Sequence, residues 1–144
     1  MEKVTHMWTG EVEHGDSVGS KGVIKSGDVQ WMTAGSGIIH QEMPRKYDGL
    51  MQGFQLWVNL PAKKKMIDPQ YRGIEKDQIP VVQKNGQKIK VVAGRVDGTE
   101  GPVRDLAIGI EYFDIELSPG AVFEQTVSKR CTAFIKSTKP VELS

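Results

Sequence analysis

The chain has 144 residues, of which 38% are hydrophobic and 26% charged, and its formal net charge is +1. This composition fits one ordinary globular domain, and a charge near zero gives no reason to expect direct binding to nucleic acid. Cys131 is the single cysteine, so no disulfide forms within the chain, and its apolar neighbours predict a buried thiol. There is no run of 18 apolar residues and no signal-like N-terminus, so we expect a cytoplasmic protein without membrane contact.

Short stretches of alternating apolar and polar residues, punctuated by 16 glycines and 7 prolines, predict strands and not helices. The first candidate strand, residues 2–9, places Glu2 and His6 on one face and Lys3 and Thr5 on the other. Further strands are expected within TGEVEHGDS, GVIKSGDVQWMTAG, IIHQEM, GFQLWVNLP, KIKVVAG, EYFDIELSPGAVF and CTAFIKS. So many short strands predict an all-β sandwich or barrel.

Two later stretches carry more specific expectations. Residues 61–80 are polar and bounded by prolines, which predicts a long connection with one short helical turn at 75–78. The alternation after residue 111 predicts three apolar residues toward the core and three others toward solvent: Phe113, Ile115 and Leu117 inward, Tyr112, Asp114 and Glu116 outward.

The stretch WMTAGSGIIHQEMP, Trp31 to Pro44, holds the clearest candidate for chemistry. His40 and Glu42 are two residues apart, so on a strand their side chains share a face, with Cα atoms about 6.5 Å apart. An imidazole and a carboxylate suit Fe(II) and other divalent transition metals. The alternative is a hydrogen-bonded imidazole at a barrel rim beside a solvated glutamate. A stable metal site takes about three protein ligands, and this pair supplies two.

The other two histidines lie earlier in the chain. His14 is at a polar strand end, where a surface or turn role is expected. His6 shares its strand face with Glu2, and it is either a ligand or a buried, hydrogen-bonded histidine. Together with His40 and Glu42, His6 would give the two-histidine, one-carboxylate composition of non-haem Fe(II) oxygenases.

The segments GDVQWMTAGSGIIHQEMP, GFQLWVNLP and DPQY, between Gly27 and Tyr71, resemble the pirin family. Weaker similarity continues through YFDIELSPGAVFEQTV and TAFI. The resemblance implies a bicupin, two jelly-roll β-barrels in one chain, whose first barrel holds iron through three histidines and a glutamate. The last two of these ligands fall on His40 and Glu42. The first two come from an HPHRGFE-type stretch, of which only the final glutamate has a counterpart here, Glu2.

The candidate metal set is therefore His40 and Glu42, with His6 and Glu2 as replacement ligands. Compared with a pirin, the chain looks truncated at both ends. The resemblance divides it into the later part of a first cupin with half a metal site (1–60), a connecting segment (61–87) and the opening strands of a second cupin (88–144). Such halves leave open sheet edges. Our hypothesis is that they are completed either as one permuted barrel within the chain or by strand exchange in a homodimer.

The implied activity is that of a metal-dependent oxygenase of the quercetin 2,3-dioxygenase type, with Fe(II) or another divalent transition metal as cofactor. Two alternatives stay open at the level of sequence. One is a metal-free binding or regulatory module that contacts a protein partner. The other is a folded fragment without catalytic activity.

Overall fold

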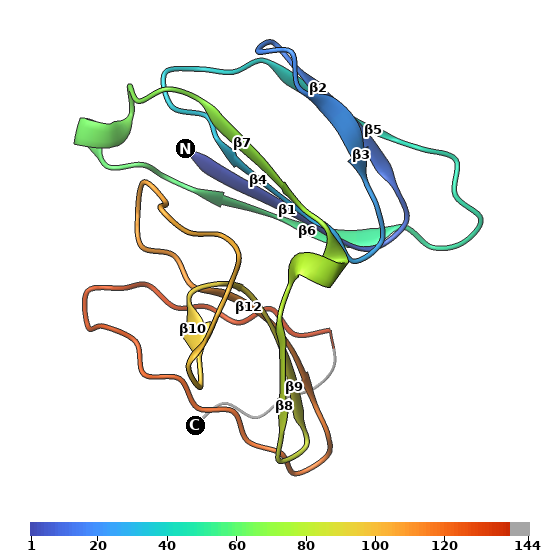
Figure 1. Ribbon diagram of the computed structural model, residues 1–144, viewed down its shortest axis with the longest axis vertical. Helices are drawn as coiled ribbons and strands as arrows, with labels where there is room; N and C mark the ends of the chain where they lie inside the picture. The colour runs from blue at the N-terminus through green and yellow to red at the C-terminus, as the bar shows by residue number, and fades with distance from the viewer. Residues whose placement is uncertain (139–144) are drawn as a thin grey trace.

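The computed structural model describes residues 1–138, and nearly all its regular structure is β-strand (Figure 1). The expected all-β class is confirmed, as is the short helical turn near residues 75–78. The elements in chain order are β1 (Glu2–Thr9), β2 (Val12–Asp16), β3 (Lys21–Ile24), β4 (Val29–Thr33), β5 (His40–Pro44), β6 (Gln52–Val58), η1 (Ala62–Lys64), β7 (Gln70–Ile74), η2 (Lys76–Gln78), β8 (Val81–Lys84), β9 (Gln87–Ala93), β10 (Arg95–Val96), β11 (Thr99–Glu100) and β12 (Tyr112–Leu117).

The first half of the chain forms two antiparallel sheets that lie one over the other (Figure 1). One sheet has the strand order β6-β1-β4-β7, and the other has the order β3-β2-β5. β1 is central in the larger sheet, and residues 2–7 are buried on both of its faces. A strand in that position has no solvent side, so even its polar residues must find partners inside the protein.

The second half is a three-stranded sheet in the order β12-β9-β8, with a small β10-β11 hairpin beside it. In this sheet, the turn of the β8–β9 hairpin has residue types suited to its backbone conformation. Asn85 and Gly86 have φ values of 46° and 76° and connect β8 to β9 as a two-residue loop. Positive φ at both central positions is what a type I′ hairpin turn requires, and Asn-Gly satisfies it at low cost.

A shared hydrophobic core joins the two halves. Val4 and Trp31 from the first half pack in one cluster with Val92 and Val103 from the second. Tyr112, which alternation predicts to face solvent, also packs against this cluster, while Leu117 at the far end of β12 is 41% exposed. The predicted orientations of the Tyr112 and Leu117 side chains were wrong, because β12 lies against the first half at one end and reaches solvent at the other.

The segment 61–87, expected as a connection, contains two strands. β7 pairs with β4 and completes the larger sheet of the first half, whereas β8 pairs with β9 in the second half. Only the short stretch around η2 passes between the two halves. The polar composition that predicted a connection reflects the exposed faces of these strands, which lie at sheet edges.

Two further expectations differ from the structure. Within residues 1–138 no backbone strand pairing joins the two halves, so they do not form a single permuted barrel. The halves meet through side chains and keep separate sheets. The stretch CTAFIKS, residues 131–137, is not a strand, and the Cys131 thiol is exposed. A strand needs a neighbouring strand for its backbone hydrogen bonds, and in the described residues this stretch pairs with none.

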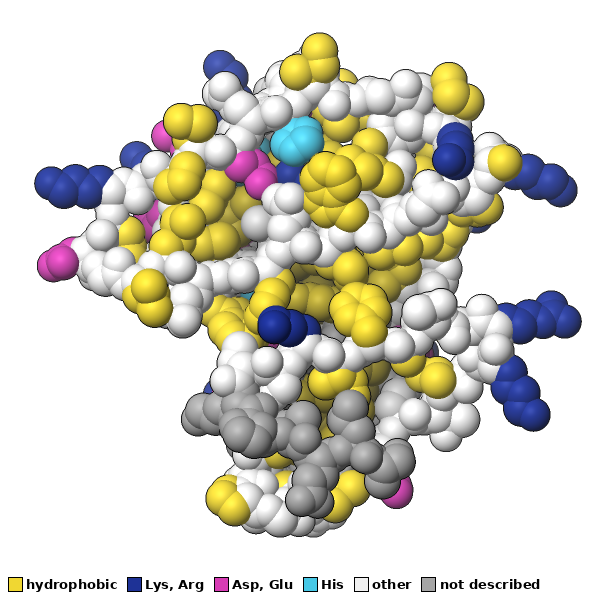
Figure 2. Space-filling model, turned by 180° about the vertical axis from the view of Figure 1, so that it is seen from behind, with side chains coloured by type: hydrophobic (Ala, Val, Ile, Leu, Met, Phe, Trp, Pro, Cys, Tyr) yellow, Lys and Arg dark blue, Asp and Glu magenta, His cyan; other side chains and the backbone are white. Residues whose placement is uncertain are grey.

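Apolar side chains reach the surface in both halves (Figure 2). From residue 118 to residue 138 the chain forms no helix or strand, and Phe134 and Ile135 are 69% and 70% exposed. Among the described residues, no helix has the length and apolar character needed to cross a membrane.

Candidate functional site

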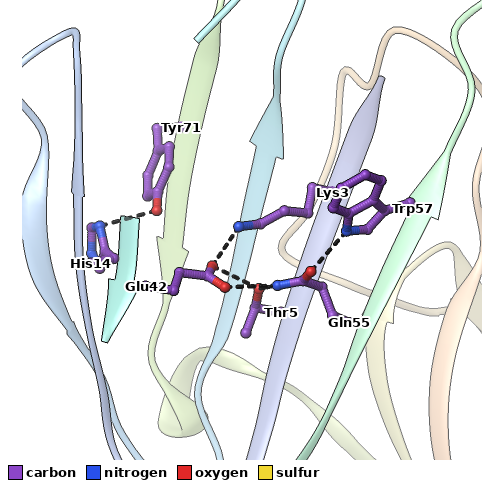
Figure 3. A network of polar contacts seen from close by, with 7 residues as sticks. All are labelled: Lys3, Thr5, His14, Glu42, Gln55, Trp57 and Tyr71. Carbon is purple, nitrogen blue, oxygen red and sulfur yellow. Dashed lines mark hydrogen bonds and ion pairs between the residues drawn. The ribbon is translucent and has the colours of Figure 1, made fainter. Parts of the chain in front are cut away.

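The Glu42 carboxylate lies between the two sheets of the first half and accepts hydrogen bonds from three side chains (Figure 3). Lys3 Nζ is 2.5 Å and Thr5 Oγ1 is 3.2 Å from Oε1, and Gln55 Nε2 is 2.7 Å from Oε2. The Lys3 side chain is 0% exposed and that of Glu42 is 18% exposed. The centre of the site is therefore a largely buried ion pair.

Strand geometry explains why these donors converge. Lys3 and Thr5 are two residues apart on β1, so they share the face that points toward β5. Gln55 on β6 pairs with Thr5, and Trp57 pairs with Lys3. Trp57 Nε1 donates to Gln55 Oε1 at 2.8 Å, which turns the amide nitrogen of Gln55 toward Glu42.

His14 and Tyr71 form a second part of the same interior face (Figure 3). His14 on β2 pairs with Glu42 on β5, and its Nδ1 lies 3.0 Å from the Tyr71 hydroxyl. The two rings stack with centroids 5.0 Å apart. A Cβ on Gly22 would lie 2.7 Å from His14 Nε2, so the glycine on β3 leaves room for the imidazole.

Burial sets the protonation states of this pair. It lowers the pKa of His14, although the nearby carboxylates Asp16 and Glu42 act in the opposite direction. Burial, with help from the same two carboxylates, raises the pKa of Tyr71. At neutral pH both groups are therefore uncharged, and one hydrogen bond joins the tyrosine hydroxyl to His14 Nδ1.

His40 is half-buried on β5, two residues before Glu42, and pairs with Asp16 on β2. The spacing expected from sequence thus holds, because both residues belong to one extended strand. Among residues 1–138 the His40 ring makes no hydrogen bond or ion pair.

Glu2 and His6 lie on the opposite face of β1 from Lys3 and Thr5. Glu2 Oε2 accepts from Trp31 Nε1 and Thr33 Oγ1, each at 2.8 Å. His6 Nδ1 is 3.2 Å from the Tyr112 hydroxyl in the second half. The structure therefore brings His40 and Glu42 onto one strand but does not bring Glu2 or His6 to them, since the sheet stands between the two faces.

The residues that the structure describes do not by themselves fit a metal ion. In the part of the chain that the structure describes, no group of three or more His, Cys, Asp or Glu side chains is placed to hold one. One of the two expected donors, Glu42, already holds the Lys3 ammonium.

Sequence patterns missed most of the residues around Glu42. Lys3 and Thr5 lie in no motif, Gln55 and Tyr71 lie in the segments GFQLWVNLP and DPQY without an assigned role, and His14 was assigned to a surface or turn role. One signal was available for Lys3. It shares one face of the predicted strand with Thr5 and Met7, and a lysine on such a face needs a partner when the face is buried.

Comparison with known proteins agrees with this architecture. Residues 1–58 match the family model described as Pirin. A pirin-like protein of Caulobacter vibrioides is 48% identical over 128 residues, which are 88% of this chain and 46% of that protein. Pirin-1 of Arabidopsis thaliana is 44% identical over 133 residues, 92% of this chain and 45% of that protein. The chain is pirin-like. It spans about half the length of these curated relatives.

A solved structure supports the cupin-type fold. The quercetin 2,3-dioxygenase of Acinetobacter baumannii superposes with a TM-score of 0.73 and 39% identity, covering 79% of this chain and 41% of that one. The expected cupin-type β fold is thereby confirmed. Likeness to quercetin dioxygenases implies a metal cofactor for a complete site of this kind, without indicating which metal.

Proposed function

We propose that this pirin-like cupin carries one half of a metal site, made of His40 and Glu42, and is not a self-sufficient dioxygenase. The observation that carries the proposal is the placement of both residues on β5, while in residues 1–138 no group of three or more His, Cys, Asp or Glu side chains is placed to hold an ion. Their position within the pirin-like stretch Trp31–Pro44 supports the assignment.

Two protein ligands are expected to hold a divalent transition metal weakly and to exchange it fast, because a stable centre takes about three. Dioxygenase activity of the quercetin type, with Fe(II), would need ligands beyond those that the structure gathers. The similarity to the Acinetobacter baumannii quercetin 2,3-dioxygenase favours this chemistry for a completed site.

The second candidate is a metal-free pirin-like module that binds a protein partner or regulates one. The saturated hydrogen bonding of Glu42 favours it, since a carboxylate held by Lys3, Thr5 and Gln55 is already satisfied without a metal. A location in the cytoplasm and assembly as a homo-oligomer are parts of both proposals.

Metal content and oxygen uptake separate the candidates. Protein purified without chelator is loaded with Fe(II), desalted and analysed for iron, and oxygen consumption is then followed with quercetin. The half-site predicts well under one equivalent of retained iron and no uptake above that of His40→Ala. About one equivalent of iron, lost in His40→Ala and accompanied by quercetin-dependent uptake, would show a complete dioxygenase instead.

A further inference from the structure

The ammonium group of Lys3 has no role in the half-site proposed above. It is fully buried, and Glu42 is the only acidic side chain within ion-pair distance of it among the described residues. The pair joins β1 to β5 across the interior of the first half, at the carboxylate expected to bind metal (Figure 3).

Burial makes this pairing obligatory. An ammonium group removed from water is costly unless an opposite charge and hydrogen bonds compensate for it. The Lys3 stem has no freedom to leave, because its strand is central in the sheet and buried on both faces. The buried Lys3 ammonium therefore depends on the negative charge of Glu42, the same charge that a metal ion would bind.

Glu42 has little capacity left for a metal ion. A carboxylate has about four lone-pair positions. Lys3 and Thr5 fill those on Oε1, and Gln55 fills one on Oε2. A divalent cation bound to the same oxygens would also lie beside the positive charge of Lys3, and like charges in a partly buried site repel strongly.

We propose that Lys3 is the built-in cation of this site, which takes the place at Glu42 that a divalent metal ion would otherwise occupy. The inference rests on the proposed function, because it assumes that Glu42 and His40 are the metal-facing pair. It adds that metal binding is limited by competition from Lys3 and not only by the number of ligands.

The test compares cobalt(II) binding by the wild type and by Lys3→Met, which keeps the apolar stem and removes the charge. Binding is measured by calorimetry and by the visible absorption of cobalt. We expect Lys3→Met to bind cobalt about tenfold more tightly or better, the size of effect typical when groups around metal ligands change. Cobalt should also raise the melting temperature of this variant and leave that of the wild type unchanged.

Two controls define the site. Lys21→Met removes an exposed lysine from β3 and should bind cobalt as the wild type does. The double variant Lys3→Met/Glu42→Gln should lose the gain, because the freed carboxylate is then gone. If Lys3→Met does not fold, Lys3→Thr replaces it, since threonine suits a strand and fills part of the space. Equal cobalt affinity in the wild type and in the folded Lys3 variant would overturn the proposal.

The outcomes distinguish this inference from the proposed function. His40→Ala is added to both backgrounds. A gain in Lys3→Met that survives His40→Ala supports the role of Lys3 and contradicts the His40–Glu42 pair. Weak wild-type binding that is lost in His40→Ala, with no gain in Lys3→Met, supports the half-site and rejects the built-in cation.

Discussion

At the scale of single residues, Glu2 serves the fold and not the metal. Its buried carboxylate accepts from Trp31 and Thr33, which would be left without partners in Glu2→Ala. Unsatisfied buried donors cost about 1–3 kcal/mol each, so we expect unfolding free energy to fall by about 3 kcal/mol in urea titrations. Glu13→Ala, at a side chain that is 63% exposed, is the matched control and should change stability by less than about 0.5 kcal/mol. Equal effects of the two variants would contradict this role.

His6 makes stability depend on pH. Burial lowers its pKa below the ordinary value of 6.5, the attraction of Asp114 opposes this, and the charge of Lys90 adds to it. Because the folded pKa is the lower one, the unfolded state binds the proton more readily. The contribution of His6 to the free energy of unfolding is therefore complete above pH 6.5, and it is lost as the pH falls below that value.

We therefore expect urea midpoints to be lower at pH 5 than at pH 7.5, with a smaller difference in His6→Phe. Burial lowers the pKa of His14 as well, so part of the pH dependence of stability will remain in His6→Phe. An unchanged pH dependence in His6→Phe would show that the buried imidazole is not responsible.

At the scale of elements, the contact between β1 and β6 depends on a glycine. A Cβ on Gly53 would lie 2.6 Å from the backbone oxygen of His6, so Gly53→Ala must push β6 away from β1. We expect a loss of about 1–3 kcal/mol in unfolding free energy. Gly73 on β7 has no atom within 4 Å of such a Cβ. Gly73→Ala should be neutral or stabilise by up to about 1 kcal/mol. An unchanged free energy of unfolding in Gly53→Ala would mean that β1 and β6 are farther apart than described.

The strands themselves were largely predictable, and the reason is local. Alternation on β1 assigned Lys3 and Thr5 to one face and Glu2 and His6 to the other, and their contacts confirm it. Alternation does not tell what covers each face. That is why Tyr112 was assigned to solvent although it packs against the shared core.

At the scale of the whole molecule, open sheet edges lead us to expect a homodimer. In the described residues β12 and β8 are both edge strands, and Phe134 and Ile135, later in the chain, are exposed. Unpaired edges and exposed apolar side chains favour association with a second copy. Light scattering should give about twice the chain mass of 16.0 kDa. The melting temperature should rise with protein concentration. A monomeric mass with cooperative, concentration-independent unfolding would contradict strand exchange.

The sequence by itself determined the all-β class, the pirin-like character and the common strand of His40 and Glu42, because these depend on local alternation and on a contiguous motif. Only the tertiary structure decided what meets Glu42. Lys3 and Gln55 reach it from the facing sheet, through a stacking of two sheets that no local pattern encodes, and His14 lies beside it on the neighbouring strand of its own sheet. Glu2 and His6 lie on the opposite face of β1, so the two residues expected as replacement ligands are core residues.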